Sequence, residues 1–254
     1  MIPIIEVKNL VKRYKKADEN AVDGVSFSVE EGEFFAFLGP NGAGKTTTIS
    51  VLTTTLSKTA GDVRIAGFDL DRHEKEVRQR IGVIFQNHSL DKNLTAEENI
   101  RFHASLYGLH SFRPFYSLMS KDYKKRLAEL ADVVGLGRDL FKPIKSYSGG
   151  MKRKLEIVRG LMHNPRVLFL DEPTTGLDPL SRKNVWSYLQ DVRKKDKTTI
   201  FLTTHYLEEA ESADHVCIIN HGRIVAYGAP RDISHEKSLE EAYLEIITNE
   251  YARA

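Results

Sequence analysis

The sequence has a single cysteine, no long apolar run and almost no net charge. Cys217 stands alone among 254 residues, so the chain cannot form an internal disulfide, which fits a reducing compartment. Its apolar neighbours predict a small buried side chain. No window approaches the roughly 18 apolar residues of a membrane-spanning helix, and Met1–Glu6 lacks the features of a signal peptide. We therefore expect a chain that neither spans nor crosses a membrane by itself.

Charge is nearly balanced, because 37 basic residues face 35 acidic ones and leave a net charge of +2. This balance gives no global basic field, so nucleic acid is not an expected partner. Charged residues make up 28% and hydrophobic residues 41% of the chain, which predicts a globular rather than a disordered protein. The length allows one large α/β domain or a core with a smaller insert.

Short apolar segments predict the strands of a sheet. The run Phe34-Phe35-Ala36-Phe37-Leu38 is typical of a strand buried on both faces, as in a parallel sheet covered by helices. Residues 4–29 alternate in a β-like pattern. Because helical stretches separate the strands, we expect an α/β core. The further buried strands are predicted over Ile81–Phe85, Val167–Leu170, Thr199–Thr203 and Val216–Asn220.

The character of the chain becomes helical from Asn87 to about Pro165. Thr95 and Glu98 have the spacing of a capping box at a helix start. Leu127, Leu130 and Val134 recur at helical spacing. We interpret this interval as an inserted helical subdomain.

The C-terminal third carries further signals of helices and turns. Asp178-Pro179 predicts a helix with Asp178 as the N-cap and proline in its first position. His221-Gly222 is expected to turn a hairpin. The residues after Pro230 form a polar tail, in which one helix is predicted over Leu239–Ile247.

One motif predicts a phosphate site. Gly39-Pro40-Asn41-Gly42-Ala43-Gly44-Lys45-Thr46 matches G-x-x-x-x-G-K-S/T and lies between a buried strand and a helix. Glycines let backbone amides turn inward around phosphates, and the helix N-terminus favours negative charge. Lys45 should reach the β- and γ-phosphates, and the Thr46 hydroxyl should bind Mg²⁺. A glycine-rich turn without a ligand is the alternative, which the preceding strand disfavours.

Two carboxylates end the strand that starts at Arg166. Asp171 is placed to hold a metal ion, and Glu172 is placed to polarise an attacking water as a general base. Such an ending by itself is often only surface charge. Together with the phosphate motif, it is typical of a Walker B element.

Between these motifs lies Tyr147-Ser148-Gly149-Gly150-Met151, which resembles the signature loop of ABC ATPases. Ser148 is predicted to cap a helix that runs to about Met162, with Gly149 and Gly150 exposing amide donors at its start. This is a second anion-binding helix end. The alternative is an ordinary cap and turn, which the position shortly before the Walker B strand disfavours.

The resemblance implies a P-loop NTPase (RecA-like) α/β core with an N-terminal antiparallel β subdomain and an inserted helical subdomain. It implies one ABC ATPase domain over residues 1–230. The core and β subdomain would take residues 1–88 and 165–230, and the helical subdomain about 89–164. Residues 231–254 would form the tail.

The resemblance also implies a paired ATPase. In ABC proteins the signature loop of one subunit caps the γ-phosphate held by the other, so Ser148, Gly149 and Gly150 would serve the ATP of a second copy. Gly176-Leu177-Asp178 resembles the D-loop at the dimer interface, although Asp178 could be only a helix cap. We expect a pair that closes around two ATP molecules with Mg²⁺, either a homodimer, which is favoured, or this chain with a relative.

Further residues match the family by order and spacing. Tyr14 would stack on adenine, or else be a surface aromatic. Thr47 would join the phosphate site. Gln86 resembles the Q-loop glutamine, which links Mg²⁺ to the transport partner. His205 resembles the switch histidine that contacts the γ-phosphate.

The signature departs from the commonest form at Tyr147 and Met151. With the following Lys152-Arg153-Lys154, it resembles the branch that exports drugs and polysaccharides through ABC-2 type permeases. The resemblance implies an integral-membrane permease as partner, and a cytoplasmic chain held on the inner face of the cell membrane by it. The basic run itself is expected to be a solvated helix face rather than a nucleic-acid site.

Two alternatives stay open at this point. Tyr107, Phe112, Phe115 and Tyr116 form an aromatic stretch that either packs an irregular loop or binds a partner, and their exposure would decide. The rival function is a soluble ABC ATPase acting on ribosomes or nucleic acid. It is disfavoured because this chain has neither the second motor domain of the translation members nor the long coiled-coil insert of the repair members. The sequence does not name the cargo.

Overall fold

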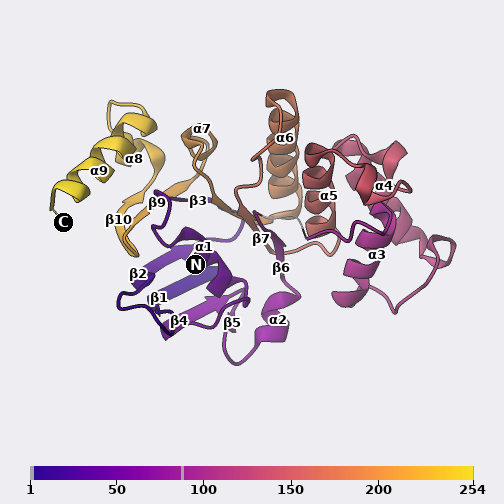
Figure 1. The fold of residues 1–254 in the computed structure, drawn as a ribbon, viewed down its shortest axis with the longest axis horizontal. Coiled ribbons are helices and arrows are strands. Elements are labelled where there is room, and N and C mark those ends of the chain that lie inside the picture. The colour runs from indigo at the N-terminus through magenta and orange to yellow at the C-terminus, as the bar shows by residue number, and fades with distance from the viewer. Residues whose placement is uncertain (1–2, 87–88, 254) are drawn as a thin grey trace.

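The computed structural model describes residues 3–86 and 89–253. Asn87, where the helical interval is predicted to begin, lies outside these ranges. Figure 1 shows two sheets, a group of helices beside them and a C-terminal helical extension at the opposite end. None of the helices within the described ranges has both the length and the hydropathy needed to cross a bilayer.

The first sheet is antiparallel, with strand order β2-β1-β4-β5. Side chains on β2 alternate between the core and solvent, as a sheet with one covered face requires. The sequence patterns predicted strands only in the first part of this sheet. Its strands are β1 (Ile5–Lys12), β2 (Val22–Val29), β4 (Ala60–Ile65) and β5 (Phe68–Asp69).

The second sheet has strand order β10-β9-β3-β8-β7-β6. Strands β9, β3, β8, β7 and β6 pair in parallel, and β10 is antiparallel to β9. All five predicted buried strands are present, with ends that differ by at most one residue. The bounds are β3 (Phe34–Leu38), β6 (Ile81–Ile84), β7 (Val167–Asp171), β8 (Thr199–Thr203), β9 (His215–Asn220) and β10 (Arg223–Gly228).

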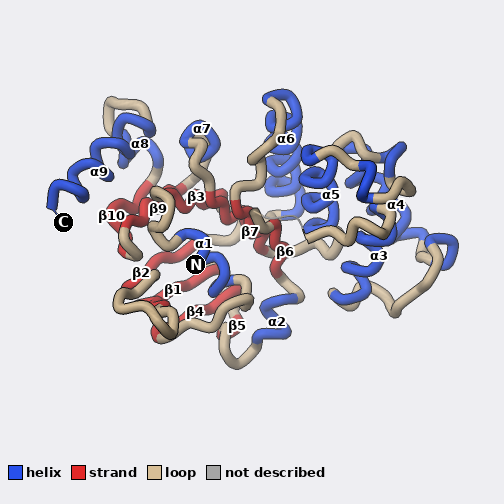
Figure 2. Tube along the Cα trace, in the orientation of Figure 1, coloured by secondary structure: helices blue, strands red, loops and turns tan. Residues whose placement is uncertain are grey.

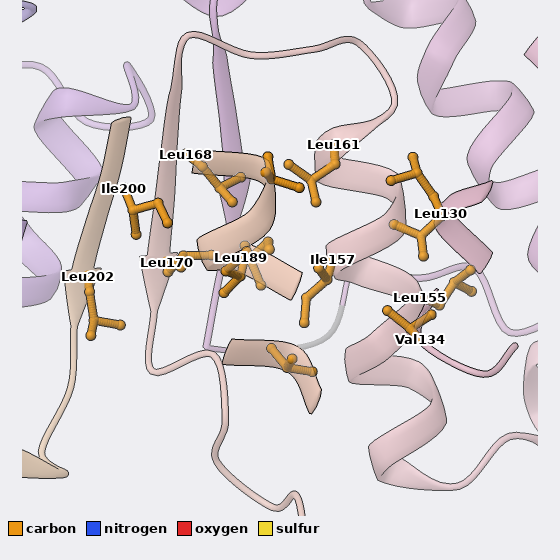
Figure 3. Close-up of a cluster of buried hydrophobic side chains, with 14 of the residues drawn as sticks. Leu130, Val134, Leu155, Ile157, Leu161, Leu168, Leu170, Leu189, Ile200 and Leu202 are labelled. Atoms are coloured by element: carbon orange, nitrogen blue, oxygen red, sulfur yellow. The ribbon is translucent and has the colours of Figure 1, made fainter. Parts of the chain in front are cut away.

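Strand β3 separates two hydrophobic cores, because its successive side chains point to opposite faces of the sheet. Phe35 and Phe37 pack with the antiparallel sheet and α1 (Lys45–Leu52). Phe34, Ala36 and Leu38 pack in the core that contains the helices. Figure 3 shows part of this second core, where leucines of β7 meet side chains of the neighbouring helices.

The helices that follow β6 include α3 (Ala96–Leu106), α4 (Lys121–Val133) and α5 (Gly149–Leu161). The predicted capping box is confirmed, because the Thr95 hydroxyl accepts from the Glu98 amide and the Glu98 carboxylate accepts from the Thr95 amide. Among the described residues outside the tail, the remaining α-helices are α2 (Glu74–Arg78), α6 (Pro179–Asp196) and α7 (Leu207–Ala210). Three short 3-10 helices cover Tyr116–Leu118, Gly137–Asp139 and Ile144–Ser146.

The tail contains more helix than predicted. Helix α8 (Pro230–Ser234) was missed, and α9 (Leu239–Arg253) continues beyond Ile247. Tyr251, four residues after Ile247, continues the helical spacing, which the prediction did not use. The hairpin turn is confirmed, with positive φ at both His221 (45°) and Gly222 (75°).

The predicted fold class is confirmed: an α/β core carries an antiparallel sheet and an inserted group of helices. The residue boundaries of the subdomains stay a prediction.

Candidate nucleotide site

Most of the predicted site residues follow the carboxyl ends of four neighbouring strands. Strands β3, β8, β7 and β6 lie side by side and run in the same direction. Their carboxyl ends therefore meet at one edge of the sheet, where ligands bind in open α/β folds. Figure 2 shows the loops that leave these strands, with α1 following β3. This geometry gathers residues that are far apart in the sequence.

Close backbone packing requires two glycines of the phosphate motif, Gly39 and Gly44. A Cβ on Gly39 would lie 2.2 Å from the Ile219 carbonyl oxygen, a distance that no real Cβ tolerates. Gly44 has a φ of 107°, and a Cβ there would lie 2.5 Å from the Ala21 carbonyl oxygen. The loop between them thus has a shape that only glycine permits, and it leads directly into the N-terminus of α1.

Lys45 points back into this loop. Its ammonium group donates to the carbonyl oxygens of Gly39 (2.6 Å) and Pro40 (3.0 Å), and the residue is only 7% exposed. Burial lowers the pKa of Lys45, whereas the charges of Glu172 and Asp171 raise it. A cation is therefore held beside two carboxylates, as a site for a phosphate and a metal ion requires.

The rest of the motif surrounds this cation. Ala43 is buried, and its carbonyl oxygen accepts from the Gly222 amide (3.0 Å). Asn41 and Thr46 are exposed, so the Thr46 hydroxyl in the first turn of α1 is open to a ligand. Gly42 adopts a φ of 81°.

Asp171 ends β7 in a buried position. Its Oδ1 accepts a hydrogen bond of 2.5 Å from the Thr203 hydroxyl of the neighbouring strand β8. Burial raises the pKa of Asp171, and the Thr203 hydrogen bond lowers it. A buried carboxylate at this edge has the hard oxygen donors that Mg²⁺ prefers.

The Glu172 carboxylate contacts two other predicted site residues, Gln86 and His205. Its Oε2 accepts from the Gln86 side-chain amide (2.9 Å), and its Oε1 lies 3.3 Å from Nδ1 of His205. The backbone of Glu172 has a φ of 49°, which lies in the left-handed region that L-residues rarely adopt. Such strain concentrates at functional sites. The structure therefore brings Gln86, Glu172 and His205 together from three strands.

Tyr14 lies next to α1. Its hydroxyl is 3.2 Å from the Thr47 hydroxyl, and the ring is 46% exposed. This places an open aromatic face beside the phosphate motif.

The predicted signature residues lie apart from this cluster. Ser148 caps α5, and its side-chain oxygen accepts from the Met151 amide (3.2 Å). Ser148 and Gly149 are exposed, and a Cβ built on Gly149 would meet no described atom within 4 Å. In Figure 1, α5 and α1 are separated by β7 and β6. Asp178 is likewise exposed, and it caps α6 by accepting from the Ser181 amide (2.9 Å).

The expectation that residues 152–154 form a solvated face is wrong for Arg153, which is 2% exposed. Its guanidinium donates to backbone carbonyls of β7 and of the segment before Gln86. A signal was present, because Arg153 stands four positions before Ile157 and thus on the buried face of α5. Lys152 and Lys154 are partly exposed.

Glu209 of α7 is a second residue that the sequence did not single out. Its buried carboxylate accepts from the hydroxyls of Thr174 and Thr204 (2.7 Å for the latter) and from the Trp186 indole (3.0 Å). It thereby joins the segment after Glu172 to the segment before His205. An acidic residue on a short helix gave no sign of this burial.

Residues 22–175 match the family model described as ABC transporter. The chain belongs to the ABC transporter family. This ABC protein is 40% identical over 236 residues to the Nod factor export ATP-binding protein I of Ralstonia nicotianae, covering 92% of this chain and 70% of that one. It is 42% identical over 230 residues to the daunorubicin/doxorubicin resistance ATP-binding protein DrrA of Streptomyces peucetius, covering 90% and 66% respectively.

Solved structures place the ABC protein among ATP-binding cassettes. An ATP binding subunit of an ABC transporter superposes with a TM-score of 0.85 at 32% identity, over 96% of this chain and 99% of that one. A dimeric cassette in a post-hydrolysis state, bound to ADP and Pi, gives a TM-score of 0.78 at 26% identity over 89% and 98%. The family, the phosphate motif and the carboxylate pair together identify an ATP-binding and ATP-hydrolysing cassette.

Proposed function

We propose that this chain powers an ABC exporter by hydrolysing ATP as one member of a pair. The observation that carries the proposal is the division of its site. Lys45 and Glu172 lie together at one edge of the sheet, while the exposed amides at Gly149 belong to a different part of the same chain. Two chains arranged head to tail would complete both sites.

The cluster at the sheet edge supports a role for each residue. Lys45 binds the β- and γ-phosphates of ATP, and Tyr14 stacks on its adenine. The Thr46 hydroxyl, the Asp171 carboxylate and the Gln86 side-chain oxygen would hold Mg²⁺, which neutralises phosphate charge when bound.

Glu172 would accept a proton from the attacking water as general base. The His205 imidazole, 3.3 Å from Glu172, would contact the γ-phosphate. The phosphate-binding set also includes the other residues of the loop and first turn, namely Gly39, Pro40, Asn41, Gly42, Ala43, Gly44 and Thr47.

Pairing gives a function to the residues that the fold keeps apart. At the N-terminus of α5, Ser148 and Gly149 are exposed and Gly150 is half-buried, and their backbone amides would suit the γ-phosphate held by a second copy. Asp178 lies in the same stretch as Leu177, which packs against Gly150. ATP would then favour the closed pair by binding it more tightly than the open one.

An exposed apolar face supports a permease partner. Phe102 and Leu106 of α3 are 53% and 69% exposed, and they line a cavity with Ser89. Ser89 stands three residues after Gln86, so an occupant of this cavity would lie close in the chain to the catalytic cluster. Exposed apolar surface of this kind marks an interaction site.

The aromatic residues between Tyr107 and Tyr116 were expected either to pack an irregular loop or to bind a partner, and their exposure differs. Phe112 and Phe115 are each 66% exposed, which favours the interpretation that they bind a partner. The Tyr107 ring packs against the rings of His103 and His163, and Tyr116 packs edge-on against Phe141, so these two tyrosines serve packing.

One relative is named for Nod factor export and another for drug resistance, and both names support an ABC-2 type permease and attachment to the inner face of the membrane. The test is co-purification with a six-span membrane permease whose gene adjoins that of this chain. Leu106→Asp should abolish it, whereas Leu244→Asp, at a 56% exposed position on α9, should not. Equal capture of both variants would contradict docking at α3. Salt-sensitive binding to RNA or DNA would instead favour the rival function.

A further inference from the structure

Arg153 of α5 binds backbone carbonyls at the edge of the sheet where the proposed catalytic residues lie. The Arg153 guanidinium donates to the carbonyl oxygens of Asp171 (2.9 Å), Glu172 (2.6 Å) and Pro173 (2.7 Å). It also donates to the Phe85 carbonyl oxygen. Five N–H donors in a rigid planar fork make such a multiple contact possible for arginine alone among the side chains.

These carbonyls belong to the residues around the proposed chemistry. Glu172 is held in its left-handed conformation from both sides, because its amide donates to the Thr203 carbonyl (3.0 Å) and its own carbonyl accepts from Arg153. Phe85 directly precedes Gln86, whose amide binds the Glu172 carboxylate. A strained conformation of this kind persists only where the surroundings determine it.

The same helix holds the chain on the other side of Gln86. The Glu156 carboxylate pairs with Arg153 (3.3 Å) and accepts from the Ser89 amide (2.9 Å). Arg159, one turn further along α5, donates to the Ser89 carbonyl oxygen (2.8 Å). Helix α5 therefore fixes residues on both sides of Gln86, together with the end of β7.

We propose that Arg153 is a positioning residue for ATP hydrolysis. By holding the Glu172 backbone and the carbonyl before Gln86, it sets the direction in which the Glu172 carboxylate points. This inference rests on the proposed role of Glu172 as general base. Arg153 itself touches neither ATP nor water in this mechanism.

The decisive variant is Arg153→Lys. Lysine keeps the positive charge for Glu156, but a single nitrogen cannot reach four carbonyls. We expect kcat per ATP-binding chain to fall by about 10- to 100-fold, because small misplacements of a catalytic group have effects of this size. The KM for ATP should change by less than about threefold. Counting only chains that bind ATP separates this effect from a loss of folded protein.

Arg101→Lys is the matched control. Arg101 is also buried, pairs with a carboxylate four positions away (Glu97) and donates to a backbone carbonyl, that of Arg113. It lies on α3 and makes none of these contacts with β7. Its kcat per ATP-binding chain should stay within about twofold of the wild type, even if stability falls.

A double-mutant cycle distinguishes positioning from a general structural role. In a Glu172→Gln background, followed over hours by phosphate release, Arg153→Lys should lower the residual rate by less than about twofold. An equal loss in both backgrounds, or an unchanged kcat in Arg153→Lys alone, would overturn the proposal. A wild-type chain without Mg²⁺-dependent hydrolysis would refute the proposed function instead.

Discussion

Glu172→Gln is the substitution that separates ATP binding from hydrolysis most cleanly. Glutamine has the same shape, and its side-chain oxygen can still accept from Gln86, which is 2.9 Å from the carboxylate in the wild type. At position 172 the backbone has a φ of 49°, where glutamate and glutamine are equally disfavoured. The fold should therefore persist, and only the basicity of the carboxylate is lost.

The size of the effect follows from this loss. A positioned general base contributes about 10²- to 10⁴-fold to a rate, which corresponds to about 3–5 kcal/mol of barrier. ATP binding should not be weakened in the way that hydrolysis is, because the substitution removes a negative charge near Lys45. Less competition for the Lys45 ammonium leaves ATP affinity unchanged or slightly higher.

The assay pairs steady-state ATP hydrolysis with sedimentation in ATP and Mg²⁺. We expect the Glu172→Gln variant to hydrolyse ATP at less than about a hundredth of the wild-type rate and to sediment as a dimer. A variant that keeps more than about a tenth of the activity would refute the general-base assignment. A monomer at saturating ATP, both alone and with the permease present, would refute the shared site.

Three further substitutions test other parts of the structure. Lys45→Ala removes the buried cation of the phosphate loop and should weaken ATP binding at least about 100-fold in a titration, a change expected for loss of a close charge pair. Burial lowers the pKa of His103 to about 3, with smaller effects from the charges of Arg159 and His163. As the pH falls below about 6.5, the imidazole is protonated in the unfolded chain but not in the folded one. The free energy of unfolding therefore decreases as the pH drops below that value. His103→Phe should reduce the loss of unfolding free energy between pH 7 and pH 5 by about 2 kcal/mol in urea titrations, and an unchanged loss would contradict its burial. Thr95→Ala removes the capping box and should cost about 1 kcal/mol at constant m value, while Thr95→Ser should cost much less.

Much of the site could be predicted from the sequence because its parts depend on local chemistry. The phosphate loop needs glycine at positions such as Gly39, where any Cβ would strike the backbone of β9. The continuous apolar run of β3 predicted a strand covered on both faces, and both faces are covered. Capping by Ser148 and Asp178 likewise involves atoms only three residues away.

Other features depend on contacts between distant segments, and there the sequence was silent or misleading. Nothing in the sequence separates exposed Phe112 from packed Tyr107, because the His163 ring that packs against Tyr107 comes from the distant loop after α5. Short helix α8 has too few residues for a periodic signal.

By itself, the sequence determined that the chain holds a phosphate loop, a carboxylate pair and a second capped helix end, since each is a local arrangement of neighbouring residues. Only the tertiary structure decided what Arg153 does. A basic residue in a basic run belongs in solvent unless acceptors surround it, and its acceptors lie 68 positions before it and 18 to 20 after it. The folded sheet brings those carbonyls together, and their hydrogen bonds offset the cost of burying the charge.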